Sequence, residues 1–222
     1  MSGWAVGDMP TLTSYLADPR PAVRLRAVMA AGTSPSVDDL ELLVEQCAVE
    51  PDLQVREMLT WALIRLPAAV VVPRLLRELD RPEAQARSQA LHTLSKTHET
   101  AVYPQVVALL GDDDPGVVRT AWRAAVVLVP SGSEESLARM LAVQLGQGDR
   151  ETQLALSRAL VGLGAGVVSP VLAGAASHRS EAVRAHASAT EELLRDPDAG
   201  SALALERARR EVALGRTRAA KG

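Results

Sequence analysis

Residues 18–31 read DPRPAVRLRAVMAA. An acidic residue and a proline come first, a Val-Arg pair follows, and small apolar residues then recur at helical spacing. The same pattern returns along most of the chain at intervals of 31 to 34 residues. Self-similarity at such a period indicates an array in which one structural unit is stacked on the next.

The arginine of the Val-Arg pair sets the register of the repeats. Apolar residues lie one position before it and three, six and seven positions after it, which is one stripe of an α-helix. Arginine fills this slot in five units, and Gln153 fills it in the remaining one. The arginines are Arg24, Arg56, Arg87, Arg119 and Arg184. The predicted core positions three residues later are Ala27, Leu59, Ala90, Trp122, Leu156 and Ala187.

A shorter apolar-periodic segment precedes each of these helices, and no segment alternates with a period of two. We therefore predict helices without strands. Prolines near the expected helix starts favour first-turn positions, where the missing N–H costs nothing; they are Pro19, Pro51, Pro82 and Pro115 for the second helices and Pro10, Pro73, Pro104 and Pro170 for the first. The unit is a helical hairpin, and its six copies are expected at about residues 9–32, 37–66, 68–97, 99–130, 133–164 and 166–195.

This unit resembles the HEAT-repeat family in its short bacterial form, which is related to phycobiliprotein-lyase-type repeats. The residues that match are Asp18, Val23-Arg24, Ala27 and Ala30-Ala31, with Asp113, Val118-Arg119, Val183-Arg184 and Ala187. The resemblance implies an all-α, right-handed solenoid of about six hairpins in a single domain over residues 1–222. It says little about function, since such repeats serve many unrelated roles.

The two ends of the chain differ from the repeats. Residues 199–222 predict a capping helix with a basic tail, because a terminal repeat needs its outer face covered. This segment carries a net charge of +4, which leaves −7 on the rest of the chain. Trp4 precedes the first repeat and is expected to cover its open end.

Composition limits the classes of function. The chain has 222 residues, 47% of them hydrophobic, and a formal net charge of −3, whereas a uniform nucleic-acid clamp would be basic. Cys47 is the only cysteine, so no intrachain disulfide forms, and it reads as a small buried hydrophobe. We find no secretory signal and no apolar stretch approaching the ~18 residues of a membrane span, and so expect a cytoplasmic protein.

The arginine column has two interpretations. In the first, each arginine bonds a neighbouring carboxylate and turn carbonyls and so ties repeats together. In the second, the arginines form a stripe of cations for phosphates. We favour the first, because Asp18, Glu50 and Asp113 recur six positions before the arginine slot and no Gly-rich phosphate loop is present.

A second column gives a candidate binding site. Second helices are expected to line the concave face, and the positions one, five and nine after the arginine slot avoid the core stripe. In the fourth repeat they are Thr120, Ala124 and Leu128. The candidate partner-binding residues are Met29, Glu57, Trp61, Arg65, Ser88, His92, Lys96 and Arg158. In one interpretation Trp61 anchors a bound peptide, as aromatic hot spots do; in the other it packs sideways on a neighbouring repeat.

Signals for catalysis and metal binding are poor. HEAT-like deoxyhypusine hydroxylases hold iron with several His-Glu pairs, and this chain has only His98-Glu99. We predict no cofactor, no metal and no catalytic residue, and expect Trp122 in the core. The leading hypothesis is a non-enzymatic scaffold for a protein or peptide partner, without a membrane. The alternatives are a nucleic-acid-binding HEAT-like protein and a lyase-like or accessory enzyme.

Overall fold

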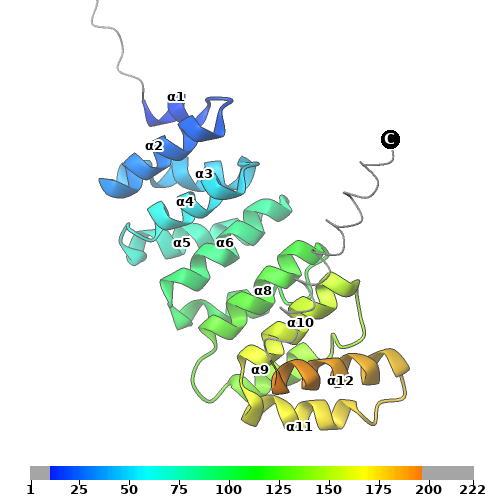
Figure 1. Ribbon diagram of the computed structural model, residues 1–222. Helices are drawn as coiled ribbons and strands as arrows, with labels where there is room; N and C mark the ends of the chain where they lie inside the picture. Colours follow the sequence, from blue (N-terminus) through cyan, green and yellow to red (C-terminus); the bar gives the residue numbers. More distant parts are fainter. Residues whose placement is uncertain (1–10, 197–222) are drawn as a thin grey trace, which may run out of the picture. The chain divides into compact units, whose positions relative to one another are not determined.

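The computed structural model describes residues 11–196, and every regular element in that range is a helix (Figure 1). Contacts group the chain into two compact units, residues 1–128 and residues 129–222. The single domain predicted over residues 1–222 stays a prediction. Trp4 and the predicted capping helix at 199–222 lie outside the described residues.

The first unit holds four helical hairpins. Second helices α2, α4, α6 and α8 contact one another in order, and each also contacts the first helix of its own hairpin. A short 3₁₀ turn leads into two of the first helices, η1 (Val37–Asp39) before α3 and η2 (Thr100–Val102) before α7. The hairpins are α1 (Leu12–Leu16) with α2 (Pro21–Thr33), α3 (Leu40–Val49) with α4 (Leu53–Leu63), α5 (Ala68–Glu78) with α6 (Ala84–Thr97), and α7 (Tyr103–Val107) with α8 (Pro115–Leu128).

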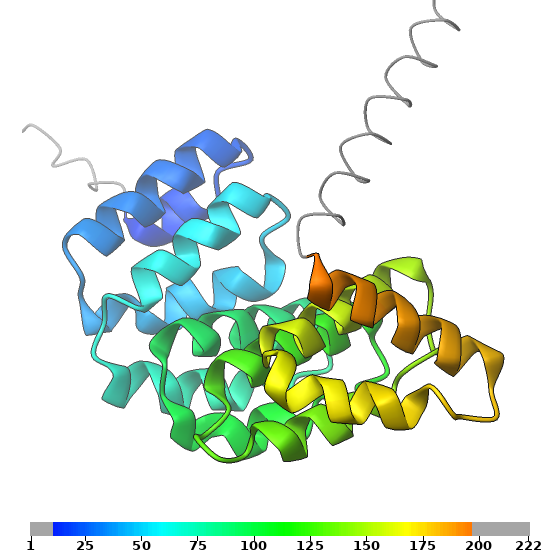
Figure 2. The ribbon, with the colours of Figure 1, turned by 60° about the horizontal axis from the view of Figure 1, so that its bottom comes forward.

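The second unit holds two more hairpins. They are α9 (Glu134–Ala142) with α10 (Arg150–Gly162) and α11 (Ala165–Ala175) with α12 (Glu181–Arg195). Helix α9 contacts α11, α10 contacts α12, and α11 and α12 lie side by side (Figure 2). The prediction of an all-α solenoid of helical hairpins is confirmed within each unit, where each hairpin packs against the next one.

Acidic caps explain where several second helices begin. The Asp52 carboxylate accepts from two amides at the start of α4, and Asp114 does the same for α8. Pro21 and Pro115 are the first residues of α2 and α8, as the missing N–H favours. Pro19, Pro51 and Pro82, expected in first turns, instead stand just before the capping residues Arg20, Asp52 and Glu83.

Two other prolines were placed incorrectly from the sequence. Pro73 and Pro170 were expected in first turns, but both lie inside a helix. The reason is that α5 and α11 begin earlier, directly after Pro67 and Gly164.

The core positions follow the predicted register. Leu59, Ala90, Trp122, Leu156 and Ala187 are all at most 2% exposed. The indole N–H of Trp122 donates to the Leu110 carbonyl at 3.2 Å, which satisfies its only donor and confirms the core interpretation. Ala27 is the exception and stays partly exposed.

Candidate functional site

The candidate site is the exposed surface of the second helices in the first unit, here called the second-helix face. Its members come from α2, α4, the residues just after α4, and α6: Met29, Glu57, Trp61, Arg65, Ser88, His92 and Lys96. Met29 is 46% exposed, Glu57, Arg65 and Lys96 are exposed, and the other three are half-buried. The remaining predicted residue, Arg158, is exposed on α10 in the second unit.

Trp61 is wedged against the preceding hairpin while part of its ring stays accessible. A Cβ placed on Gly32 of α2 would lie only 2.1 Å from Cζ3 of Trp61, so the ring edge occupies the space that glycine leaves. The Arg65 guanidinium stands over the ring, with 5.3 Å between Cζ and the ring centroid. At that distance the cation interacts favourably with the ring face. Trp61 therefore packs sideways on the preceding hairpin, while part of its ring stays accessible in a fixed position. Its role as the anchor of a bound peptide stays a prediction.

Glu57 and His92 bring α4 and α6 together on this face. Glu57 Oε2 lies 3.4 Å from His92 Nε2, within ion-pair distance when the imidazole is protonated. The same Nε2 atom forms no hydrogen bond with any residue between 11 and 196. Ser88 is different, because its hydroxyl is 2.9 Å from that of Thr120 and so belongs to the contact between α6 and α8.

The predicted ridge does not continue onto α8. Thr120, Ala124 and Leu128 are 6%, 1% and 0% exposed. Small residues at these positions let α8 pack closely, and Thr120 is held by Ser88 of α6. The second-helix face is therefore formed by α2, α4 and α6, and the extension to the fourth repeat is wrong.

Arginines of this column hydrogen-bond the turns that precede their helices. In four of the five arginines Nη1 donates to the carbonyls six and five residues before it: Asp18 and Pro19 for Arg24, Glu50 and Pro51 for Arg56, Arg81 and Pro82 for Arg87, and His178 and Arg179 for Arg184. Arg119 holds the same position on α8 and is half-buried. In the remaining repeat Gln153 Nε2 donates to the Gly148 carbonyl, five residues before it, at 3.2 Å.

Two arginines also tie neighbouring hairpins together. Arg24 binds Glu50 of the next hairpin with both nitrogens, at 2.8 and 2.6 Å, and Arg87 binds Asp112 at 2.9 and 2.9 Å. Burial alone would raise the pKa of Glu50, but the bonds from Arg24, the Asp52 amide and Gln46 outweigh it and lower that pKa. Hydrogen bonding to Arg87 likewise lowers the pKa of Asp112. Groups engaged in this way are poorly placed to hold a phosphate.

A buried serine–histidine pair occurs in the second unit. His186 Nε2 lies 3.0 Å from Ser157 Oγ and 2.9 Å from the Gln153 carbonyl, while Nδ1 accepts from the Gly146 amide at 3.0 Å. Since a backbone amide only donates, the imidazole proton must sit on Nε2. That nitrogen cannot accept a proton from Ser157, so the pair lacks the arrangement of an activated nucleophile.

The remaining chemical candidates are equally limited. Burial raises the pKa of the Cys47 thiol far above its usual value, which makes it inert. No cluster of three or more His, Cys, Asp or Glu side chains suited to a metal occurs within residues 11–196. None of the helices described there has the length and apolar character of a bilayer crossing.

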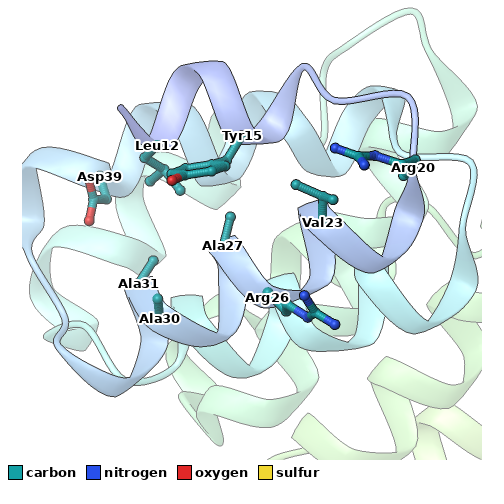
Figure 3. Close-up of a pocket in the computed structure, with 9 residues that line it drawn as sticks. All are labelled: Leu12, Tyr15, Arg20, Val23, Arg26, Ala27, Ala30, Ala31 and Asp39. Carbon is teal, nitrogen blue, oxygen red and sulfur yellow. The ribbon is translucent and has the colours of Figure 1, made fainter. Parts of the chain in front are cut away.

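The sequence analysis missed a groove at the start of the first unit, here called the end groove. It has a volume of about 750 Å³ and lies between α1 and α2 (Figure 3). Its lining residues are Leu12, Tyr15, Arg20, Val23, Arg26, Ala27, Ala30, Ala31 and Asp39. A signal for it was present, because Ala27, Ala30 and Ala31 occupy core slots in the first of the six predicted hairpins.

The comparison with protein families agrees with this architecture. Residues 6–64 match the family model for HEAT repeats. The crystal structure of an engineered protein, a Northeast Structural Genomics Consortium target, is similar at 18% identity and a TM-score of 0.45, over 83% of this chain and 53% of that one. This chain thus spans about half the length of that protein. No curated protein matches it. Residues 6–64 are thus similar to HEAT repeats, which are in general protein-interaction scaffolds.

Proposed function

We propose that this protein is a non-enzymatic scaffold that binds a peptide or protein segment on the second-helix face. The observation that carries the proposal is the fixed, half-exposed ring of Trp61, braced by Gly32 and covered by Arg65. A ring already held in position loses little conformational entropy on binding. Tryptophan and arginine are also the side chains that most often dominate binding energy at interfaces.

The surroundings of Trp61 favour an acidic partner segment with an apolar anchor. Met29 supplies exposed apolar surface on one side. Arg65 and Lys96 are exposed cations at the same end of neighbouring helices, and Glu57 lies near His92. A carboxylate beside the apolar anchor would pair with Arg65 or Lys96. These rim charges are expected to contribute more to partner choice and association rate than to affinity.

The alternatives have less support. For a nucleic-acid clamp, Arg24 and Arg87 are engaged with carboxylates, and the column as a whole bonds turn carbonyls. For an enzyme, Ser157 would need an unprotonated histidine nitrogen beside its hydroxyl, but His186 Nε2, which lies there, carries the proton. The binding face therefore remains the best-supported site.

The test begins with a displayed random-peptide library selected on the full-length protein. Selected peptides are then titrated calorimetrically against wild type, Trp61→Ala and Leu53→Ala. Leu53 is the matched control, since it is a large apolar residue on α4 that is 62% exposed and does not belong to the face. Trp61→Ala should weaken binding by about 2 kcal/mol, roughly 30-fold, while Leu53→Ala changes little.

Two results would refute the proposal. One is equal binding by wild type and Trp61→Ala, with both folded by circular dichroism. The other is tight binding of duplex or single-stranded oligonucleotides that Trp61→Ala does not affect. Gly32→Ala adds a sharper probe, because the new methyl group must push the Trp61 ring from its position without removing it. Peptide affinity should then fall although every side chain of the face is still present.

A further inference from the structure

The second-helix face carries opposite charges at its two ends along α4. Glu57 and Trp61 lie on α4 and Arg65 follows its end by two residues, so the three stand at intervals of four residues and share one side of the helix. The Glu57 side chain is 58% exposed, and the Arg65 guanidinium stands over the Trp61 ring. The ring is therefore preceded along α4 by a carboxylate and followed by a cation.

Helix α6, which contacts α4, adds a second cation to this face and no second acid. Lys96 is exposed and holds the same place in its repeat as Arg65, nine positions after the arginine slot. Ser88 holds the same place as Glu57 but is uncharged, and its hydroxyl is engaged with Thr120 of α8. One end of the face thus carries a single carboxylate, and the other end carries two cations.

These charges are not neutralised by arginines or carboxylates of the first unit. Exposed glutamates elsewhere in the unit bind arginines, as Glu41, Glu45 and Glu83 do. Glu57 forms no hydrogen bond within residues 11–196, and its ion-pair neighbour there is the His92 imidazole, at 3.4 Å. An imidazole is charged only when protonated, so it does not hold the carboxylate as an arginine does. Arg65 and Lys96 form no ion pair in the same range of the chain.

We propose that the partner of the second-helix face is an extended segment with opposite charges on the two sides of its apolar anchor. A basic residue two positions from the anchor pairs with Glu57, and an acidic residue two positions away on the other side pairs with Arg65 and Lys96. This pairing rests on the proposed function, because it takes Trp61 as the point where the anchor binds. It adds a basic residue to the acidic one already expected.

The spacing of the charges agrees with an extended partner. Glu57 and Arg65 are eight residues apart, which is about 12 Å at helical rise. Four residues of an extended chain cover about 13 Å, and alternate side chains of such a chain point to the same side. A partner helix would need about nine residues to meet the same three groups, and isolated helices shorter than about 12–15 residues are marginal in water. The extended segment is therefore the smaller partner that satisfies the face.

A peptide selection on the full-length protein tests this charge pattern. The probe is a displayed library of short peptides with leucine fixed at the centre and four random positions on each side. On wild type, we expect basic residues to be enriched two positions from the leucine on one side and acidic residues two positions away on the other. On Glu57→Arg, acidic residues should be enriched on both sides, because every charge of the face is then positive. Glu192→Arg makes the same change at an exposed glutamate of α12 and should leave the wild-type pattern unchanged.

Calorimetric titration of one selected peptide measures the pair between its basic residue and Glu57. Glu57→Gln should weaken binding about two- to fivefold, the usual effect of an exposed ion pair. The same variant should match wild type for a version of the peptide in which alanine replaces the basic residue. Glu192→Gln is the matched control and should bind both peptides as wild type does.

Several outcomes would overturn the charge pattern while leaving the proposed function standing. One is a set of peptides that need Trp61 but carry acidic residues on both sides of the leucine on wild type. Another is enrichment of opposite charges four positions from the leucine, which would mean a helical partner. Continued enrichment of basic residues on Glu57→Arg would mean that a different acid of the protein is recognised. By contrast, peptides that bind equally well to Trp61→Ala would refute the proposed function and the charge pattern together.

Discussion

The α4–α6 junction in the first unit and the α10–α12 junction in the second are built on the same plan, with a glutamine at the centre of the first and a histidine at the centre of the second. In the first unit Gln89 Nε2 donates to the Thr60 hydroxyl at 2.8 Å and to the Arg56 carbonyl at 3.2 Å. In the second unit His186 Nε2 stands at the corresponding point, beside the Ser157 hydroxyl and the Gln153 carbonyl. A threonine hydroxyl completes each network, from Thr93 and Thr190.

The same hydrogen-bond geometry is independent of pH at one junction and depends on protonation at the other. Gln89 keeps the same donor at every pH. Protonation of His186 leaves the Nε2–H donor in place but adds a proton to Nδ1, which can then no longer accept from the Gly146 amide. The arginine slot differs too: Arg24 and Arg87 tie their hairpins to the next with ion pairs, whereas the slot of α10 holds the uncharged Gln153.

Removing the ion pair between Arg24 and Glu50 in the first unit should have the largest effect on the free energy of unfolding. Arg24→Ala leaves the Glu50 carboxylate, 0% exposed, without its cation. We expect a loss of about 3–5 kcal/mol in the free energy of unfolding, the usual cost of an uncompensated buried charge. Chemical denaturation followed by circular dichroism measures it, and Arg77→Ala, an exposed arginine on α5, should change stability by less than about 0.5 kcal/mol. Similar losses in both variants would contradict a role for the ion pair.

The second ion pair is more exposed and should matter less. Arg87 and Asp112 side chains are 14% and 9% exposed, against 9% and 0% for Arg24 and Glu50. Arg87→Ala is expected to lower the free energy of unfolding by about 1–3 kcal/mol, through loss of a charged hydrogen-bond partner. Unchanged denaturation midpoints, together with weaker sulfate or phosphate binding, would instead support the phosphate-stripe interpretation.

The histidine junction should respond to pH in a window where the ion pairs do not. Burial lowers the pKa of His186 below its ordinary 6.5. Between the two pKa values the unfolded chain binds the proton and the folded chain does not, so stability is full above pH 6.5 and falls as the pH drops below it. The slope is at most about 1.4 kcal/mol per pH unit for one proton. Glu50 and Asp112, with lowered pKa values, stay ionised across this window.

Exchanging the two residues separates this effect from the other histidines. In the wild type, lowering the pH from about 7 to about 5.5 is expected to reduce the protection of α12 amides from hydrogen exchange. His186→Gln should remove this pH dependence, and Gln89→His should introduce it in α6. Persistence of the pH dependence in His186→Gln would mean that another group is responsible.

The smallest effect is expected from restoring the arginine slot of α10. The longer side chain of Gln153→Arg can donate to two turn carbonyls, whereas the Gln153 side chain donates to one. A gain of a few tenths to about 1 kcal/mol in the free energy of unfolding is expected. Gln153→Ala should change stability in the opposite direction, and thermal scans of the three proteins provide the ranking.

Much of this architecture could be predicted from the sequence because it depends on local periodicity. The position three residues after Arg56 or Arg87 belongs to an apolar stripe along a single helix, and so Leu59 and Ala90 were placed correctly in the core. The position of the arginines after a turn likewise determined their bonds to carbonyls five and six residues before them. Such contacts lie within one hairpin and recur with the motif.

Which faces of the second helices are buried depends on tertiary packing and could not be predicted from the sequence. Thr120 and Ala124 have the same register as the exposed face of α4, yet they are buried. Ala27 has the register of a core residue, yet it lines the end groove. His186 showed no sign in the sequence that it takes the place of Gln89. Burial at each of these positions depends on what packs against the helix from a neighbouring hairpin, and that neighbour lies about 30 residues away, beyond the reach of any local pattern.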